Sequence, residues 1–336
     1  MGNCSCRSNT NNKLESGEEH DTQDMSPTAE KRRLSSKKPV LPTLPGFNED
    51  ENSRYPLYDN DDIISHSQLQ HNIHRYIWQN NFSSPVDDLL RKGSARVLEI
   101  GCGDGIWTID LAKEFTWSLF TGVDAHQKFD QRVEQTNVTF LKADVLDGLP
   151  FESNYFDLVF MRFLSFSERQ WLEKVANEIV RVCKPGGWVE IMDCTNQYAP
   201  KGSATSQLEI VYYEYLKSKN PDLMLNPRYE DYLRSTNKIT VIKREEKRIT
   251  LGKGGGKIGP LLVQNIIATW EQSKKTLSEL MGVSEKEFDN LIRTFQKETN
   301  DLKTSTRYVR IYVILIDMNV SKINENENEN KIVITS

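Results

Sequence analysis

A glycine-rich turn between a buried strand and a helix is the segment of this sequence best suited to bind a ligand. It reads VLEIGCGDG (97–105), and three of its residues are alternating glycines: Gly101, Gly103 and Gly105. Glycine is favoured where the backbone has a positive φ or approaches a ligand closely, and the following helix presents free backbone N–H groups. The dinucleotide-binding pattern needs glycine at 106, where this chain has Ile106. Glu99 precedes the turn, so the segment favours a cationic ligand over a pyrophosphate.

Two further acids follow the next two predicted strands. Asp124 lies 23 residues after Gly101, near the distance at which a carboxylate reaches the hydroxyl groups of a ribose. Asp144 follows the third strand, where an acid can accept a hydrogen bond from an adenine amino group. Open α/β sheets bind ligands at the carboxyl ends of their strands. The three acids and the glycine turn therefore predict a site for a nucleoside that carries positive charge.

Five segments, in this order and spacing, resemble the motifs of class I S-adenosylmethionine-dependent methyltransferases: VLEIGCGDG, GVDA, KADVLDGLPF, FDLVFMRF and CKPGGWVEIMD. The resemblance covers about 95–193 and implies methyl transfer from S-adenosyl-L-methionine. It implies that the glycine turn shapes the methionine end of the site, that Glu99 orders the ligand ammonium, that Asp124 binds the ribose and that Asp144 flanks the adenine. The implied cofactor-binding residues are Glu99, Gly101, Cys102, Gly103, Gly105, Asp124, Ala125, Asp144, Val145 and Met161.

A narrower resemblance extends toward the N-terminus. The segments RYPLYDND, QLQH and GIWTIDLA, with KPGGWVE, are similar to those of fungal methyltransferases related to the velvet-complex regulator of secondary metabolism. Such proteins usually carry an acidic run and an arginine ahead of LQH, where this chain has Ile63, Ile64 and His66. The resemblance leaves two functions open. The chain either methylates a small-molecule or protein acceptor, or acts as a cofactor-binding, weakly active or inactive regulator through protein partners.

The acceptor half of the site is less defined by sequence. MRFL (161–164) follows the fourth strand and differs from the D/N-P-P-Y/F tetrad of enzymes that methylate amino groups of nucleic acids. Arg162 and Phe163 are the acceptor-side candidates, and Arg162 either binds an acidic substrate or pairs with Glu168. A general base is needed only if the acceptor is protonated, so no catalytic residue is assigned. His66, His71 and His74 lack matched carboxylates in the sequence and predict no metal site.

Alternating strands and helices must position these residues. Strands are predicted at 95–100, 119–123, 138–141, 157–161, 188–192, 239–251 and 307–316. Helices are predicted at 106–115, 167–182, 206–217 and 261–280, with another opening at Ser284 in a capping box. The alternation indicates right-handed βαβ units. The expected fold is an α/β, Rossmann-like sheet of seven mostly parallel strands with an antiparallel last strand, helices on both faces and helical lid insertions.

Composition divides the chain into three parts. Residues 1–50, rich in Ser, Asn, Thr, Pro and charge, predict a disordered N-terminal tail. Residues 51–320 form the expected methyltransferase domain, with a core at 94–195 and helical cap segments at about 203–235 and 258–300. Residues 321–336, which include NENENEN, predict a disordered low-complexity tail.

Charge and cysteine usage narrow the functional classes. The chain has 43 basic and 48 acidic residues and a net charge of −5, which argues against non-specific binding to nucleic acid. Its five cysteines are scattered and include no CxxC pair, which favours a reducing, intracellular compartment.

The N-terminal residues include candidate lipidation sites and a basic segment. In MGNCSC, Gly2 suits N-myristoylation, and Cys4 and Cys6 are candidates for palmitoylation. Two acyl groups would give stable membrane contact, which the basic segment KRRLSSKK (31–38) would strengthen. The expected localisation is cytoplasmic or nuclear, and peripheral membrane association through acylation is the alternative.

Overall fold

The computed structural model describes residues 65–126, 134–164, 166–219, 221–223 and 228–316, all of which belong to one compact unit. The two predicted tails, the acylation sites and the basic segment lie outside the described residues and stay predictions. Within the described part of the chain, no helix is long and apolar enough to cross a membrane.

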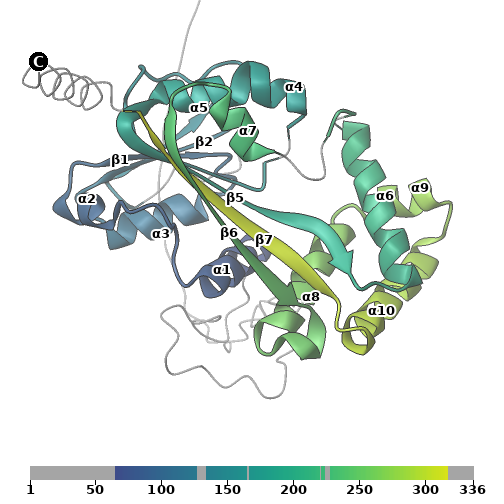
Figure 1. The fold of residues 1–336 in the computed structure, drawn as a ribbon. Helices are drawn as coiled ribbons and strands as arrows, with labels where there is room; N and C mark the ends of the chain where they lie inside the picture. The colour runs from purple at the N-terminus through teal and green to yellow at the C-terminus, as the bar shows by residue number, and fades with distance from the viewer. Residues whose placement is uncertain (1–64, 127–133, 165, 220, 224–227, 317–336) are drawn as a thin grey trace, which may run out of the picture. The chain divides into compact units, whose positions relative to one another are not determined.

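A seven-stranded sheet forms the centre of this unit (Figure 1). Its strand order is β3-β2-β1-β4-β5-β7-β6. Strands β1 to β5 pair in parallel, and β7 is antiparallel to both β5 and β6. The strands are β1 (Arg96–Ile100), β2 (Leu119–Asp124), β3 (Val138–Lys142), β4 (Phe156–Arg162), β5 (Cys183–Ala199), β6 (Ile239–Thr250) and β7 (Ser305–Leu315). The predicted fold, with its antiparallel last strand, is confirmed.

The strand order reverses between β1 and β4. The chain runs outward from β1 to β3 on one side and then returns to place β4 on the other side of β1, with Ile100 opposite both Val123 and Met161. In open α/β sheets such a switch point forms a crevice outside the carboxyl ends of the strands. The glycine turn and the residues that follow β2, β3 and β4 therefore gather at one edge of the sheet.

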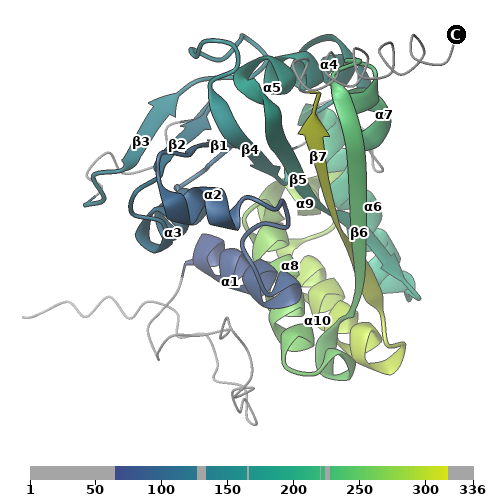
Figure 2. The same ribbon diagram turned by 60° about the vertical axis from the view of Figure 1, so that its left-hand side comes forward.

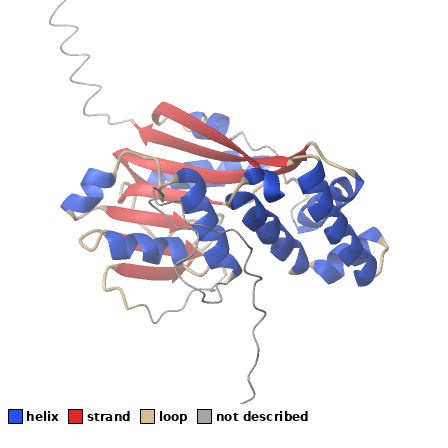
Figure 3. Cartoon of the chain, turned by 90° about the horizontal axis from the view of Figure 1, so that it is seen from below, coloured by secondary structure: helices blue, strands red, loops and turns tan. Residues whose placement is uncertain are grey.

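Helices lie on both sides of the strands (Figure 3). Successive residues of β4 point to opposite faces: Leu158 and Phe160 join one hydrophobic core, and Val159 and Met161 join the other. The first face is covered by α1 (His66–Trp78), α2 (Asp87–Lys92) and α3 (Ile106–Glu114). The second is covered by α4 (Glu168–Gln170), the π-helical segment η1 (Trp171–Val175), α5 (Ala176–Val182) and α7 (Tyr229–Arg234).

A second group of helices lies near one end of the long strands β5 to β7 (Figure 2). It contains α6 (Ser203–Lys219), α8 (Ile258–Glu271), α9 (Lys274–Met281) and α10 (Glu285–Asp301), preceded by the 3₁₀ turn η2 (Gly252–Gly255). Glu298 of α10 accepts hydrogen bonds from the free backbone N–H groups of Ala204 (3.0 Å) and Thr205 (2.8 Å) and so caps α6. Helix α8 packs against α1, where His66 Nε2 lies 3.3 Å from the carbonyl oxygen of Asn265.

Several predicted boundaries differ from the structure. The helix expected at 261–280 is two helices, because the chain breaks at Gln272 and Ser273. Strand β5 is longer at both ends than the predicted 188–192. At its start, Cys183 already pairs with β4, and the strand bulges before Trp188, where Gly186 has a φ of 74°. At its end, pairing with β7 continues to Ala199. Helix α2 did not appear among the predicted elements, and α7 lies within the helical cap segment expected at 203–235. The capping box at Ser284 is confirmed.

Candidate cofactor site

The glycine turn has the backbone conformation that its residues suggest. Gly101, Gly103 and Gly105 have φ values of 72°, 58° and 82°. A Cβ atom at Gly101 would lie 2.5 Å from Leu164 Cδ2, and one at Gly105 would lie 2.3 Å from Phe140 Cζ. A Cβ at Gly103 would meet no atom within 4 Å. Two of the glycines therefore permit close packing, and the face of Gly103 is open to a ligand.

Asp124, at the end of β2, is held by backbone groups. Its Oδ2 accepts a hydrogen bond from the N–H of Gly103 (2.9 Å), and its Oδ1 accepts one from the N–H of His126 (2.8 Å). Ala125 lies between Asp124 and His126 in the chain. A carboxylate oxygen accepts more than one hydrogen bond, so each oxygen can still receive a ligand hydroxyl. A hydrogen bond thus links Asp124, at the end of β2, to Gly103, in the turn after β1.

The other predicted residues lie around the same edge. Asp144 follows β3, and its Oδ1 accepts from the N–H of Leu146 (2.9 Å) in a turn. Val145, Met161 and Cys102 are buried and form apolar packing beneath the strand ends. Burial raises the pKa of the Cys102 thiol well above its usual range, which fits a packing role rather than a nucleophile.

Glu99 is fully buried, with an exposed fraction of 0%. Thr108 Oγ1 donates a hydrogen bond to its Oε2 (2.6 Å), while Oε1 has no hydrogen-bond partner among the described residues. Burial raises the pKa of Glu99 to about 7, although the charge of Arg162 opposes this shift. Direct contact between Glu99 and a ligand ammonium, which the resemblance implies, therefore requires the side chains above Glu99 to rearrange.

Arg162, at the end of β4, contacts Glu99 and the N-terminal helix. Its side chain is 14% exposed, its Nε lies 3.5 Å from Glu99 Oε1, and its Nη1 donates to His71 Nδ1 (3.2 Å). The alternative prediction, that Arg162 pairs with Glu168, is wrong. Glu168 pairs instead with Arg228 at 2.5 Å, because it belongs to a helix on the opposite face of the sheet.

His71 completes a polar chain that the sequence analysis missed. Arginine can only donate, so His71 Nδ1 accepts from Arg162, and the proton on Nε2 points to Asp110 Oδ2 at 3.3 Å. Burial lowers the pKa of His71 to about 4, and the imidazole is neutral at pH 7. A signal was available: QLQH and GIWTIDLA, which supply His71 and Asp110, both belong to the narrower family resemblance. Among the described residues, no group of three or more metal-binding side chains is arranged to hold an ion.

Phe163 has a strained backbone. Its φ is 54°, in the left-handed region that non-glycine residues rarely adopt. Its N–H donates to the carbonyl oxygen of Met192 (3.1 Å), and its ring centroid lies 4.5 Å from that of His74, which in turn lies 5.4 Å from Tyr308. Strained residues occur most often at functional sites. Phe163, which is partly exposed, adjoins the end of β4 and stays the acceptor-side candidate, while the buried rings of His74 and Tyr308 pack against it in turn.

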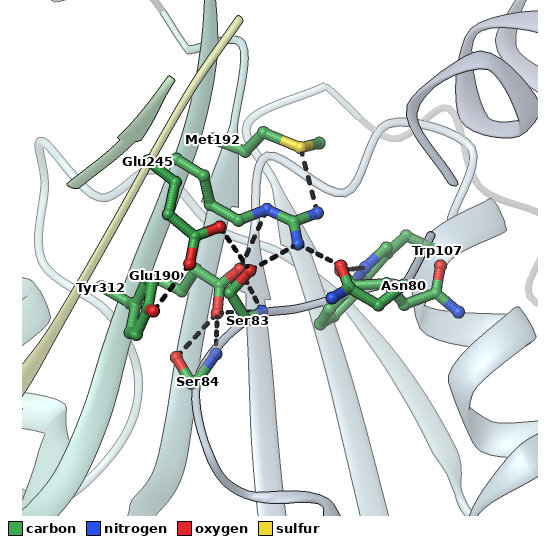
Figure 4. Close-up of polar contacts among 10 residues, drawn as sticks. Asn80, Ser83, Ser84, Trp107, Glu190, Met192, Glu245 and Tyr312 are labelled. Carbon is green, nitrogen blue, oxygen red and sulfur yellow. Dashed lines mark hydrogen bonds and ion pairs between the residues drawn. The ribbon is translucent and has the colours of Figure 1, made fainter. Parts of the chain in front are cut away.

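A buried ion pair fixes the loop between α1 and α2 to the sheet (Figure 4). Glu190 of β5 accepts hydrogen bonds from the N–H groups of Ser83 (2.9 Å) and Ser84 (2.8 Å). Arg310 of β7 lies 3.3 Å from Glu190 through its Nε and also donates to Asn80 Oδ1 and Ser83 Oγ. We call this group the Glu190–Arg310 clamp. It sets the position of α1, which carries His71 and His74.

Comparison with known proteins gives three findings. Residues 97–187 match the family described as methyltransferase domain. The secondary metabolism regulator laeA of Coprinopsis cinerea is 26% identical over 239 residues, which cover 65% of this chain and 58% of that protein. The N-methyltransferase sirN of Leptosphaeria maculans is 22% identical over 241 residues, 68% of this chain and 83% of that protein.

Among solved structures, phosphoethanolamine N-methyltransferase 2 of Haemonchus contortus is similar with a TM-score of 0.43 and 21% identity, covering 76% of this chain and 59% of that one. The match to the laeA protein of Coprinopsis cinerea spans little more than half of that protein's length. Residues 97–187 are a methyltransferase domain of the class I, S-adenosylmethionine-dependent type, in a chain that resembles the fungal laeA-type proteins.

Proposed function

We propose that this protein binds S-adenosyl-L-methionine at the carboxyl ends of β1 to β3 and transfers its methyl group to a small-molecule or protein acceptor. The observation that carries the proposal is the pairing of an open glycine with a fixed acid. The face of Gly103 is empty within 4 Å, and the N–H of the same residue holds Asp124.

The residues present fit this cofactor. Asp124 has acceptor capacity left for the ribose hydroxyl groups, Asp144 and Val145 follow β3 where the adenine is expected, and Glu99 Oε1 is an acceptor without a hydrogen-bond partner. When bound, the cofactor supplies a methyl group activated by its sulfonium. The protein's contribution is then orientation and exclusion of water, and the measured effect of such positioning on reaction rates is large.

The acceptor side follows from the aromatic group at the end of β4. Phe163 is partly exposed beside the switch point, and the buried rings of His74 and Tyr308 pack against it in turn. Asp193, next along β5, accepts a hydrogen bond from the hydroxyl of Tyr229, and burial raises the pKa of Asp193 to about 6. Tyr229 belongs to α7, on the other face of the sheet from His74 and Tyr308, so Asp193 points away from this aromatic group.

A regulatory function is the second candidate. It is supported by the similarity to a protein named as a regulator of secondary metabolism, and by the full burial of Glu99 beneath Arg162. In this case the chain binds the cofactor, transfers methyl groups slowly or not at all, and acts through protein partners.

Binding of S-adenosylhomocysteine, measured by calorimetry, tests the cofactor site. We expect the wild-type protein to bind it and Asp124→Ala to lose roughly tenfold or more in affinity, because a charge-assisted hydrogen bond disappears. Asp88→Ala, an exposed acid on α2, is the matched control and is expected to bind like the wild type. Equal affinities for all three proteins would place the cofactor elsewhere. Transfer of a labelled methyl group to cell extracts then separates the enzyme from the regulator.

A further inference from the structure

A chain of polar side chains joins α3 and the N-terminal helix α1 to the end of β4. Asp110 Oδ2 accepts a hydrogen bond from His71 Nε2, and His71 Nδ1 accepts one from Arg162 Nη1. Asn81, in the loop held by the Glu190–Arg310 clamp, also donates to Asp110 (3.0 Å). Arg162 is therefore oriented from one side by the neutral His71, which the carboxylate of Asp110 holds in place.

The carboxylates of Glu99, Asp104 and Asp110 all act on the charge of Arg162, but among the described residues only Glu99 lies within ion-pair distance of it. His71 is a neutral acceptor, and the nearest carboxyl group, Glu99 Oε1, lies 3.5 Å from Nε without forming a hydrogen bond. Burial raises the pKa of Glu99 to about 7, which weakens that ion pair further. Among the described residues, none accepts a hydrogen bond from Nη2 of Arg162. A buried guanidinium with one unused side favours an anionic ligand, and a carboxylate matches its planar donor geometry.

The order of the strands indicates which part of a ligand reaches Arg162. Asp144, Asp124 and the glycine turn follow β3, β2 and β1, which are neighbours in the sheet, and Arg162 ends β4, the next strand along. With adenine at β3 and ribose at β2, a nucleoside with an amino-acid extension points that extension across β1 toward β4. The amino-acid end carries both an ammonium and a carboxylate group.

We infer that Arg162 binds the carboxylate at the amino-acid end of the methyl donor, and that His71 is the positioning residue that orients Arg162 for this contact. The inference rests on the proposed function, since it assigns part of the same site. It also gives α1 a function in cofactor binding, although α1 precedes the matched domain.

The test compares two ligands by calorimetry: S-adenosylhomocysteine and decarboxylated S-adenosylhomocysteine, which keeps the ammonium group and lacks the carboxylate. We expect the wild type to prefer the first by roughly ten- to a hundredfold, as a charge-assisted pair predicts. In Arg162→Met this ratio falls close to one, while Arg162→Lys keeps part of it. Arg228→Met, which removes an exposed charge outside the polar chain, keeps the wild-type ratio.

Two variants of His71 separate positioning from general stability. In His71→Asn the amide oxygen replaces Nδ1 and still accepts from Arg162, whereas in His71→Gln the amide reaches the place of Nε2, near Asp110. We expect His71→Asn to keep the ligand preference and His71→Gln to lower it several-fold. A purely structural histidine would make the two variants alike or reverse their order.

The outcomes distinguish the inference from the proposed function. If the wild type binds neither ligand, the proposed cofactor site is wrong. If it binds both and Arg162→Met leaves the ratio unchanged, the carboxylate assignment is overturned while the cofactor site stands. Thermal melts identify any variant that does not fold, and in that case Arg162→Lys and His71→Gln decide.

Discussion

At the scale of single residues, three glycines in one turn have different functions. Gly101 and Gly105 are required because side chains of Leu164 and Phe140 occupy the space of a Cβ atom. Gly103 is required by nothing in the folded chain except its φ of 58°. We therefore infer that the space beside Gly103 is kept free for a ligand.

Alanine at position 103 tests this difference. Gly103→Ala is expected to cost about 1–2 kcal/mol in unfolding free energy because of the positive φ, and to lower affinity for S-adenosylhomocysteine at least tenfold because the methyl group enters the ligand's space. Gly282→Ala is the matched control: Gly282 has a φ of 68° and an equally open Cβ position, and it ends α9. A similar affinity loss in both variants would argue against a ligand at Gly103.

His71 predicts a pH dependence of stability. Its pKa is lowered from 6.5 to about 4 by burial, so the unfolded chain binds this proton more readily than the folded one. Its contribution is complete above pH 6.5 and is lost as the pH falls through 4, by up to about 3 kcal/mol. Urea unfolding at pH 7 and pH 4 is expected to show a smaller loss on acidification in His71→Asn than in the wild type. Equal losses would mean that folding does not lower the pKa of His71.

At the scale of elements, the position of α1 depends on the Glu190–Arg310 clamp rather than on its own helical tendency. The clamp satisfies two backbone N–H groups of the loop after α1, and α8 contacts the other side of the helix. Helix α1, which carries His71 of the polar chain to Arg162, is thus held by β5 and α8, which are far from it in the sequence.

Breaking one half of the clamp is expected to be costly. Glu190→Gln removes the carboxylate that pairs with the buried guanidinium of Arg310, and removal of one partner of a buried ion pair typically costs about 3–5 kcal/mol. Chemical denaturation measures this loss. Glu246→Gln, at an exposed acid on β6 that pairs with Arg244, is expected to change stability by less than about 1 kcal/mol. A loss of similar size in both variants would show that the clamp is not the main anchor.

At the scale of the whole described unit, the proposed cofactor site lies between two groups of helices. The site lies at the sheet edge, α1 covers its Arg162 side, and α8 of the second helical group packs on α1. Ligand binding is therefore expected to stabilise the unit as a whole.

Thermal unfolding checks this expectation. S-adenosylhomocysteine at a hundred times its Kd is expected to add about 2.7 kcal/mol, which raises Tm by roughly 5–10 °C for a unit of this size. Hydrogen exchange in α1 and α8 is expected to slow together with that of the glycine turn. Protection confined to the turn would mean that the second helical group unfolds independently.

The amino-acid sequence alone was enough to predict the sheet and the residues of the proposed cofactor site. The strand–turn–helix segment at Glu99–Gly105, the acids Asp124 and Asp144, and the seven-stranded sheet are local patterns, because each depends on periodicity or on residues within one βαβ unit. The partners of Arg162 were decided only by the tertiary structure. His71, Asp110 and Glu99 come from three elements, and burial, which no local pattern encodes, sets their charges. The same holds for Arg310 and Glu190, which meet only because β7 inserts beside β5.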